Sequence, residues 1–202
     1  MKHRYEVAVI NRAVFSSVWI KKPVAIPAPA PVVTDSCYSS TKWSIVKQHY
    51  AQNATCGPSA FVQAIAEFNV FDITHEEAAI AMGTNVSTPP HKVLEGGQKL
   101  LSAKGINTKT YKKTFSELGG WKGVGELIVD TKRTFVLHHC YKCSRTAGHY
   151  VALMKVCLDS KIVTVAENLH GTYQERPFSS LECDMKCMTW GDGKSFLIFE
   201  RI

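Results

Sequence analysis

The sequence predicts an α+β fold in which N-terminal helices pack on a mostly antiparallel sheet. After Cys56, apolar residues recur at helical spacing, which indicates a helix with one buried face. Later in the chain, short apolar or alternating stretches are typical of strands at 106–111, 134–139, 149–157, 161–166 and 195–201. A run of helices followed by a run of strands indicates an α+β domain, with the sheet packed on the Cys56 helix.

Each expected helix has a recognisable start or an apolar face. The first helix carries four apolar residues on one face, Phe61, Val62, Ile65 and Phe68. Pro58 suits its first turn, because the N–H that proline lacks would have no helical partner there. The stretch 74–77 has the capping-box pattern that opens a short helix, and a further helix is expected over 91–103, ending at Gly105.

The chain is predicted to consist of an N-terminal extension, residues 1–35, and one folded domain, residues 36–202. Alternating prolines within 26–31 favour a stiff polyproline spacer. Such a spacer can tether the domain to a larger particle or partner, and a disordered tail without a role is the alternative. The 202 residues, 45% of them apolar, are enough for one substantial core.

Charge and hydropathy narrow the range of partners. The net charge of +7 favours an anionic surface such as a cell-wall polymer, and nucleic acid is a minor alternative because the lysines are scattered. Apolar stretches fall well short of the ~20 residues that span a bilayer, so no membrane partner is expected. Charged residues interrupt the start of the chain, which argues against a signal peptide and predicts synthesis in the cytoplasm.

Cys56 stands where a polar loop meets the first helix, a position that suits a nucleophile. Unpaired N–H groups and the positive end of the helix dipole favour the thiolate there. The thiolate, rather than the thiol, attacks a carbonyl carbon effectively. A small buried core cysteine is the alternative, but the flanking Thr55, Gly57 and Ser59 argue against a purely apolar setting.

A candidate base and a candidate orienting residue lie at the ends of two predicted strands. His149 directly follows Gly148 at the start of a strand, where its ring can be held rigidly with one edge accessible. A surface or core role is the alternative for this histidine, which is one of eight. The next strand ends in Glu167 and Asn168, and either side chain could accept the second imidazole N–H as the third member of a triad.

Three blocks carry a family resemblance: 55–60 (TCGPSA), 148–153 (GHYVAL) and 165–171 (VAENLHG). In order and spacing they resemble papain-like cysteine peptidases of the double-glycine leader peptidase type. The resemblance covers roughly residues 41–202 and implies a papain-like fold, with Cys56 opening the central helix and His149 heading a strand. The stretches 73–77 and 83–91 are further similar to pseudomurein endoisopeptidases of methanogen viruses.

The chain departs from the family pattern in the third triad position. Glu167 stands where the family has Asp, and its extra methylene moves the carboxylate by about one C–C bond. Asn168 stands where the family has Pro, and asparagine is the residue type that papain itself uses. Both residues are candidates, and Glu167 is the expected one, because it aligns with the family Asp and a carboxylate both fixes the tautomer of His149 and stabilises the imidazolium.

A second departure concerns the oxyanion donor. The family places a glutamine shortly before the cysteine, where this chain has Tyr50 between Gln48 and Gln52. Either glutamine could stabilise the oxyanion together with the Cys56 N–H, a contribution often worth ~3 kcal/mol. A solvated loop residue is the alternative for each glutamine.

The resemblance implies a cysteine peptidase or isopeptidase that hydrolyses amide bonds through a thioester acyl-enzyme. The viral likeness implies a virus-encoded endopeptidase that cleaves a pseudomurein or peptidoglycan cross-link, either virion-associated or released to act on the cell wall. Leader-peptide or polyprotein processing is the alternative within the same chemistry. Alternatives of other classes are a non-catalytic binding component of a viral particle and an acyl transferase.

Six cysteines remain besides Cys56, namely Cys37, Cys140, Cys143, Cys157, Cys183 and Cys187. The spacings 140/143 and 183/187 resemble the two halves of a tetrahedral zinc site. Three histidines are possible substitute ligands, His138, His139 and His170. Unlinked thiols are nevertheless the favoured expectation, because a reducing cytoplasm keeps thiols reduced, and structural zinc and then disulfides are the alternatives. No cofactor is expected for the chemistry at Cys56.

Overall fold

The computed structural model describes residues 36–43, 55–85, 87–143, 148–187 and 195–202. The chain forms two units, Met1–Val33 and Thr34–Ile202, and all the described residues belong to the second. The expected proline-rich tether lies outside them. Within the described ranges, no helix combines the length and the apolar character needed to cross a membrane.

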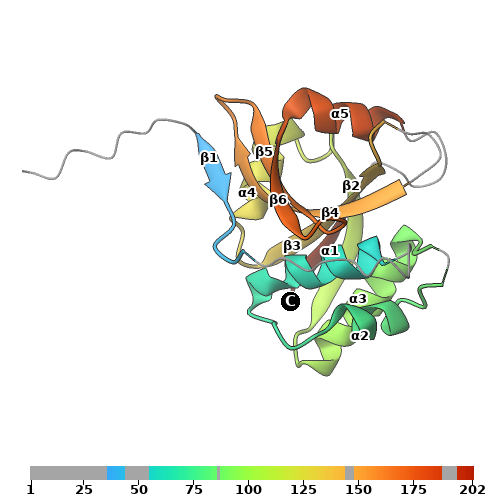
Figure 1. Ribbon diagram of the computed structural model, residues 1–202. Helices are drawn as coiled ribbons and strands as arrows, with labels where there is room; N and C mark the ends of the chain where they lie inside the picture. The colour runs from blue at the N-terminus through green and yellow to red at the C-terminus, as the bar shows by residue number, and fades with distance from the viewer. Residues whose placement is uncertain (1–35, 44–54, 86, 144–147, 188–194) are drawn as a thin grey trace, which may run out of the picture. The chain divides into compact units, whose positions relative to one another are not determined.

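Seven strands form the sheet of the described domain (Figure 1). Six of them follow the order β2-β7-β3-β4-β5-β6, and β1 pairs with β4 outside this path. Every pairing is antiparallel, which confirms the predicted fold class. The strands are β1 (Cys37–Ser39), β2 (Thr108–Thr114), β3 (Arg133–Cys140), β4 (Gly148–Cys157), β5 (Ile162–Glu167), β6 (Thr172–Pro177) and β7 (Ser195–Arg201).

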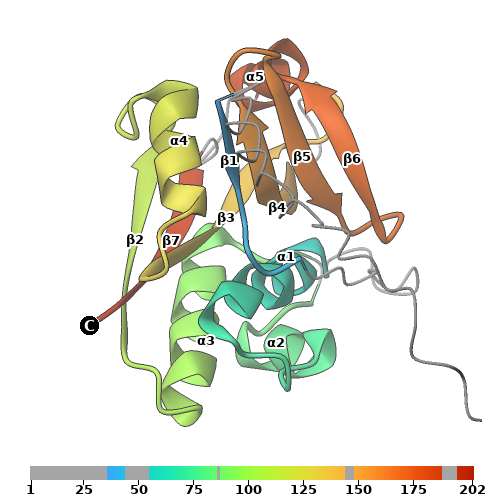
Figure 2. The ribbon, with the colours of Figure 1, turned by 90° about the vertical axis from the view of Figure 1, so that its left-hand side faces the viewer.

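Helices cover both faces of this sheet (Figures 1 and 2). The α-helices are α1 (Cys56–Ala64), α2 (His75–Ala81), α3 (Pro90–Ala103), α4 (Gly120–Ile128) and α5 (Phe178–Cys187). One hydrophobic cluster joins α1, α2 and α3 to one face of the sheet, and a second joins α4 and α5 to the other. Neighbouring strand residues alternate between the clusters, since Val136 belongs to the first and Leu137 to the second.

The Cys56 helix forms as predicted but is shorter. Its residues after Cys56 are all buried, and the helix packs against β4 and β3. The α-helix ends at Ala64 and continues as a 3₁₀ turn, Ile65–Phe68, which Asn69 terminates in the left-handed conformation with φ 58°. The capping box at α2 is confirmed: the Glu77 N–H donates to the Thr74 hydroxyl, and the Thr74 N–H donates to the Glu77 carboxylate.

Sequence reasoning missed four elements, β1, β6, α4 and α5. The β6 strand is mostly polar, and α4 contains three glycines, so neither shows the usual pattern of its class. The first long strand was expected at 106–111 but lies at Thr108–Thr114, where it pairs with β7 along its whole length. Hydrogen bonding to a neighbouring strand, rather than local hydropathy, determines where β2 begins and ends.

The expectation of unlinked thiols is wrong for four cysteines. Cys37 faces Cys157 across the β1–β4 pairing, and the two form a disulfide. A second disulfide joins Cys143, just beyond β3, to Cys183 on α5. Cys56, Cys140 and Cys187 take no part in these two disulfides.

The expected set of four zinc ligands also changes. The three sulfurs that lie within 4.8 Å of one another are those of Cys143, Cys183 and Cys187. Cys140 is buried and does not belong to this group. The spacing of Cys140 and Cys143 therefore does not translate into a shared site, since Cys140 still belongs to β3 and Cys143 lies in the turn beyond it.

The packing of α3 on α1 and β7 predicts that Gly97→Ala destabilises the fold. An added Cβ would lie 2.6 Å from a ring carbon of Phe61 and 2.6 Å from one of Phe199. Both rings are fully buried and pack on each other, so we expect a loss of about 1–3 kcal/mol in the free energy of unfolding. Urea unfolding would measure the loss, with the exposed Ser102→Ala in the same helix as control. A Gly97→Ala protein as stable as the control would contradict this packing.

Candidate active site

Cys56 is the first residue of α1 and stays partly exposed, whereas the rest of the helix is buried. Thr55 precedes it as the N-cap and makes no side-chain cap bond. The first N–H groups of a helix have no partner within the helix, so the thiol lies beside unpaired donors. The buried residues after Cys56 hold the helix in the core, and Cys56 itself packs partly buried against the edge of the first hydrophobic cluster.

Close packing at the start of α1 explains the glycine that follows the thiol. A Cβ on Gly57 would lie 3.2 Å from Val93 Cγ2 and 3.4 Å from Thr88 Cβ and from Tyr150 Cδ2. These neighbours belong to α3, the segment before it, and β4. A larger residue would have to displace these neighbours or shift the start of α1, and Cys56 with it.

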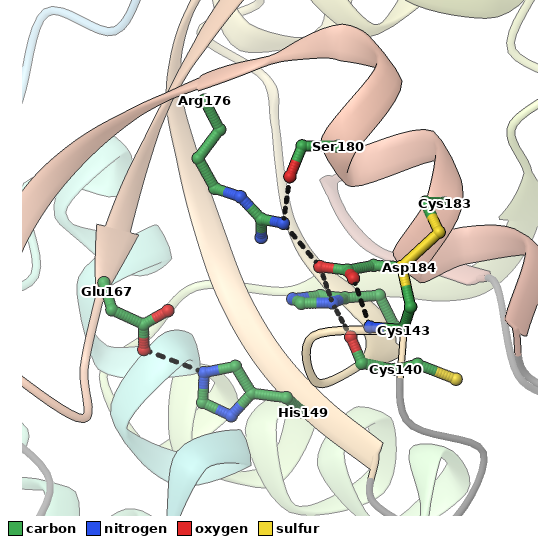
Figure 3. A network of polar contacts seen from close by, with 9 residues as sticks. Cys140, Cys143, His149, Glu167, Arg176, Ser180, Cys183 and Asp184 are labelled. Atoms are coloured by element: carbon green, nitrogen blue, oxygen red, sulfur yellow. Dashed lines mark hydrogen bonds and ion pairs between the residues drawn. A yellow bond between two sulfur atoms is a disulfide. The ribbon is translucent and has the colours of Figure 1, made fainter.

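His149 and Glu167 form a buried pair beside Cys56. His149 is the second residue of β4 and is 4% exposed, and Glu167 ends β5 and is 5% exposed. The imidazole Nε2 lies 2.9 Å from Glu167 Oε1, and Figure 3 marks this contact with a dashed line. The Leu169 N–H donates to the same carboxylate oxygen at 3.2 Å. Because Nε2–H donates to Glu167, the other ring nitrogen is left for the thiol.

The electrostatics of this pair favour an imidazolium. Burial alone would lower the pKa of His149, but hydrogen bonds to Cys56 and Glu167 and their negative charges outweigh burial and raise it to about 9. Burial would also raise the pKa of Glu167, yet the hydrogen bond and charge of His149, with the Leu169 N–H, hold it below its usual value. At neutral pH, His149 is therefore charged and lies within hydrogen-bonding reach of Cys56.

Asn168 is fully buried but has a different set of partners. Its Nδ2 donates to the carbonyl of Cys56 at 3.1 Å and to the carbonyl of Tyr150 at 2.9 Å. These bonds tie the first residue of α1 to the strand that carries His149. Of the two candidate orienting residues, Glu167 bonds to the imidazole and Asn168 bonds to the backbone on either side of the site.

A second layer of side chains surrounds His149. His139 stands opposite His149 in the β3–β4 pairing, and their ring centroids are 5.6 Å apart with nearly perpendicular planes. The ring of Tyr141 meets His149 in the same edge-on manner at 5.4 Å. Together these two rings restrict how far the imidazole can turn away from Cys56 and Glu167.

Asp184 lies beneath this layer, almost fully buried on α5. Its carboxylate accepts from Arg176 at 2.6 Å and from the Cys143 N–H at 2.7 Å (Figure 3). Its Oδ2 is also 3.5 Å from Nδ1 of His139, which contacts the Cys140 carbonyl. Burial and the charge of His149 lower the pKa of His139 well below its usual value, so this second ring is neutral.

Two expected site residues, Gln48 and Gln52, fall outside the described residues, and sequence reasoning missed other residues of the site. Asp184 and Tyr141 were not foreseen, because a polar residue on a helix and a tyrosine after a strand look like ordinary surface residues. The pairing of two adjacent predicted strands was the one signal that could have placed His139 beside His149.

Comparisons with known proteins place the described domain in a structural class. It is similar to the peptidase domain of Streptococcus ComA, a bifunctional ABC transporter of a quorum-sensing pathway, with a TM-score of 0.54 and 12% identity over 78% of this chain and 98% of that chain. It is also similar to a double-glycine motif protease from an AMS/PCAT transporter in complex with the leader peptide, with a TM-score of 0.52 and 16% identity over 81% and 95%. No family model and no curated protein matches the sequence. The domain therefore has the papain-like fold of double-glycine peptidase domains.

The raised pKa of His149 predicts how stability depends on pH. Unfolded, the ring titrates near ~6.5, whereas in the folded protein its pKa is about 9. The folded state keeps a proton that the unfolded state releases, so this stabilisation is full below pH ~6.5 and is lost as the pH rises through the folded value. Urea unfolding between pH 6 and 10 should show a steeper decline for the wild type than for His149→Asn. The exposed His170→Asn is the control, and a wild-type decline no steeper than that of His149→Asn would contradict the assignment.

The bonds of Asn168 predict a mainly structural effect of its removal. Asn168→Ala removes the Nδ2 donor from the buried bond to the Tyr150 carbonyl and from the partly buried bond to the Cys56 carbonyl, and we expect a loss of about 1–3 kcal/mol in the free energy of unfolding. The exposed Asn107→Ala should change stability little. Titration of the imidazole by NMR separates the roles, because Asn168→Ala should leave the His149 pKa near its wild-type value and Glu167→Gln should lower it. The reverse result would make Asn168 the orienting residue.

Proposed function

We propose that this protein is a cysteine peptidase or isopeptidase, with Cys56 as nucleophile, His149 as acid and base, and Glu167 as the orienting carboxylate. The observation that carries the proposal is the buried hydrogen bond between His149 Nε2 and Glu167, on a ring that also reaches the thiol at the start of α1. His149 thus stands in space between the orienting residue Glu167 and the nucleophile Cys56 and contacts both. This is the arrangement that activates a thiol.

The geometry supports a two-step reaction. The Cys56 thiolate attacks the carbonyl carbon of an amide, and the carbonyl electrons move onto oxygen. His149 then gives its proton to the leaving amine as the C–N bond breaks, which yields a thioester and a neutral imidazole. Water attacks the thioester while His149 accepts its proton, and the carboxylic product leaves as the thiolate returns.

The oxyanion requires donors close to the thiolate. The Cys56 N–H at the start of the helix is one candidate, and Gln52 or Gln48 is proposed as the second from the sequence resemblance. The charged His149 adds a favourable field at the same place. Such fixed dipoles act strongly because they need no reorientation during the reaction.

We propose a cell-wall cross-link as the substrate, cleaved by a virus-encoded enzyme that is virion-associated or released. The likeness of 73–77 and 83–91 to pseudomurein endoisopeptidases supports this choice, and the net charge of +7 suits an anionic wall. Two disulfides support a site of action outside the reducing cytoplasm in which synthesis is expected. The N-terminal extension is proposed as the attachment to a larger particle.

Processing of a leader peptide is the second candidate. It is supported by the fold, because one structural neighbour is a double-glycine motif protease captured with a leader peptide. Both candidates use the same three residues and differ in the acyl group that is presented to Cys56. Wall fragments and linear leader peptides, digested in parallel and analysed by mass spectrometry, separate them.

The triad predicts a ranking of variants in that assay. Cys56→Ala should abolish cleavage, and Glu167→Gln should lower kcat by about 10²- to 10⁴-fold with KM nearly unchanged, because the amide no longer stabilises the imidazolium. Asn168→Ala should lower kcat much less. Glu175→Gln, at an exposed position on β6, is the matched control.

Loss of all cleavage, and equal slow alkylation of Cys56 and Cys187 by iodoacetamide, would overturn the peptidase proposal. That result would favour a non-catalytic component of a particle. Cleavage only of a linear leader would overturn the wall substrate and leave the chemistry intact. Transfer of the acyl group to an added amine in preference to water would identify a transferase.

A further inference from the structure

Three cysteines gather on the α5 side of the sheet, apart from the thiol at Cys56. Cys143 lies in the turn after β3, and Cys183 and Cys187 are one helical turn apart on α5. Their sulfurs all lie within 4.8 Å of one another. Figure 3 shows the disulfide between Cys143 and Cys183, and Cys187 adds a third, free sulfur that this bond does not use.

The arrangement matches the needs of a thiolate metal site. Zinc binds thiolate sulfur at about 2.3 Å in tetrahedral geometry, which places the sulfurs about 3.8 Å from one another. The three sulfurs are already inside a 4.8 Å limit, so side-chain rotation alone can bring them to that spacing. Cys143 and Cys187 are partly exposed and Cys183 is exposed, so an ion can reach the site from solvent.

The cluster does not depend on the disulfide for its position. Asp184, next to Cys183 on α5, accepts the Cys143 N–H at 2.7 Å and is itself held by Arg176 at 2.6 Å. Asp184 is 1% exposed, so these bonds are shielded from water. When the disulfide opens, the Cys143 backbone therefore remains fixed against α5, and its thiol stays beside the other two.

We propose that Cys143, Cys183 and Cys187 bind one Zn²⁺ when the Cys143–Cys183 disulfide is reduced. A dithiol or phosphine reductant supplies two electrons and opens the disulfide to two thiols. The three thiols then release three protons as three Zn–S bonds form. Water occupies the fourth position. The cluster joins the β3–β4 connection to α5 through the metal under reducing conditions and through the disulfide under oxidising conditions.

Metal titration of the full-length protein tests this site. The Cys56→Ala background removes the active-site thiol as a competing ligand, so the result is independent of peptidase activity. After reduction with a phosphine under argon, Co²⁺ should bind with a stoichiometry of one and produce a thiolate-to-cobalt charge-transfer band. Added Zn²⁺ should displace it. The oxidised protein should show no such band.

Single variants identify the ligands. Cys187→Ser keeps the native disulfide in the oxidised protein, so its fold can be checked by circular dichroism. After reduction, this variant should bind Co²⁺ at least about 10- to 100-fold more weakly than the parent. Cys140→Ser is the matched control and should bind like the parent, because Cys140 lies outside the cluster. Binding unaffected by Cys187→Ser, or lost with Cys140→Ser, would overturn the assignment, as would a reduced parent that binds no Co²⁺.

Discussion

The hydrogen bond between Glu167 and His149 determines how the rest of the site is arranged. Both side chains are almost fully buried, and a buried carboxylate or imidazolium without its partner would be destabilised by several kcal/mol. The β4–β5 pairing satisfies this requirement. Ala152 stands opposite Ala166 at the end of the pairing, and this register, continued by one residue, sets His149 as the diagonal neighbour of Glu167. Diagonal neighbours are about 7–8 Å apart, a distance that long side chains bridge. The longer reach of glutamate suits this geometry.

Glu167 and Asn168 have different partners because Glu167 is the last residue of β5, whereas Asn168 begins the turn after it. Successive residues of a strand point to opposite faces. Tyr150 belongs to the cluster around α1, whereas Val151 belongs to the cluster around α4 and α5. Asn168 bonds to backbone carbonyls of Cys56 and Tyr150, on the α1 side. The end of β5 and the turn after it thus supply both the group that stabilises the imidazolium and the group that bonds α1 to the sheet.

Sequence reasoning recovered the parts of this molecule that depend on local pattern. The helical spacing after Cys56 and the run of apolar strands gave the fold class, and the start of a helix marked the thiol. It failed where only distant pairing provides the information. Cys37 lies opposite Cys157 because the three-residue strand β1 pairs with β4. The short polar segment around Cys37 has no sequence pattern that predicts this strand.

The same limit applies to Asp184. Its position on α5 follows from packing against β3 and β6, and its neighbours in sequence are those of an exposed helix. A carboxylate buried at that depth has no local signature. The expected zinc ligands show the same limit of local sequence pattern. Cys140 and Cys143 are close in sequence, but only Cys143 lies in the cluster with the cysteines of α5.

Charge is distributed so that the candidate site holds one imidazolium. Two histidines face each other across β3 and β4, and two charged rings at 5.6 Å would repel. Arg176, rather than His139, pairs with the buried Asp184 at 2.6 Å. The charge of Asp184 is therefore already balanced, and burial together with the charge of His149 keeps the pKa of His139 low. Because His139 stays neutral, the proton resides on His149, where Glu167 stabilises it within reach of Cys56.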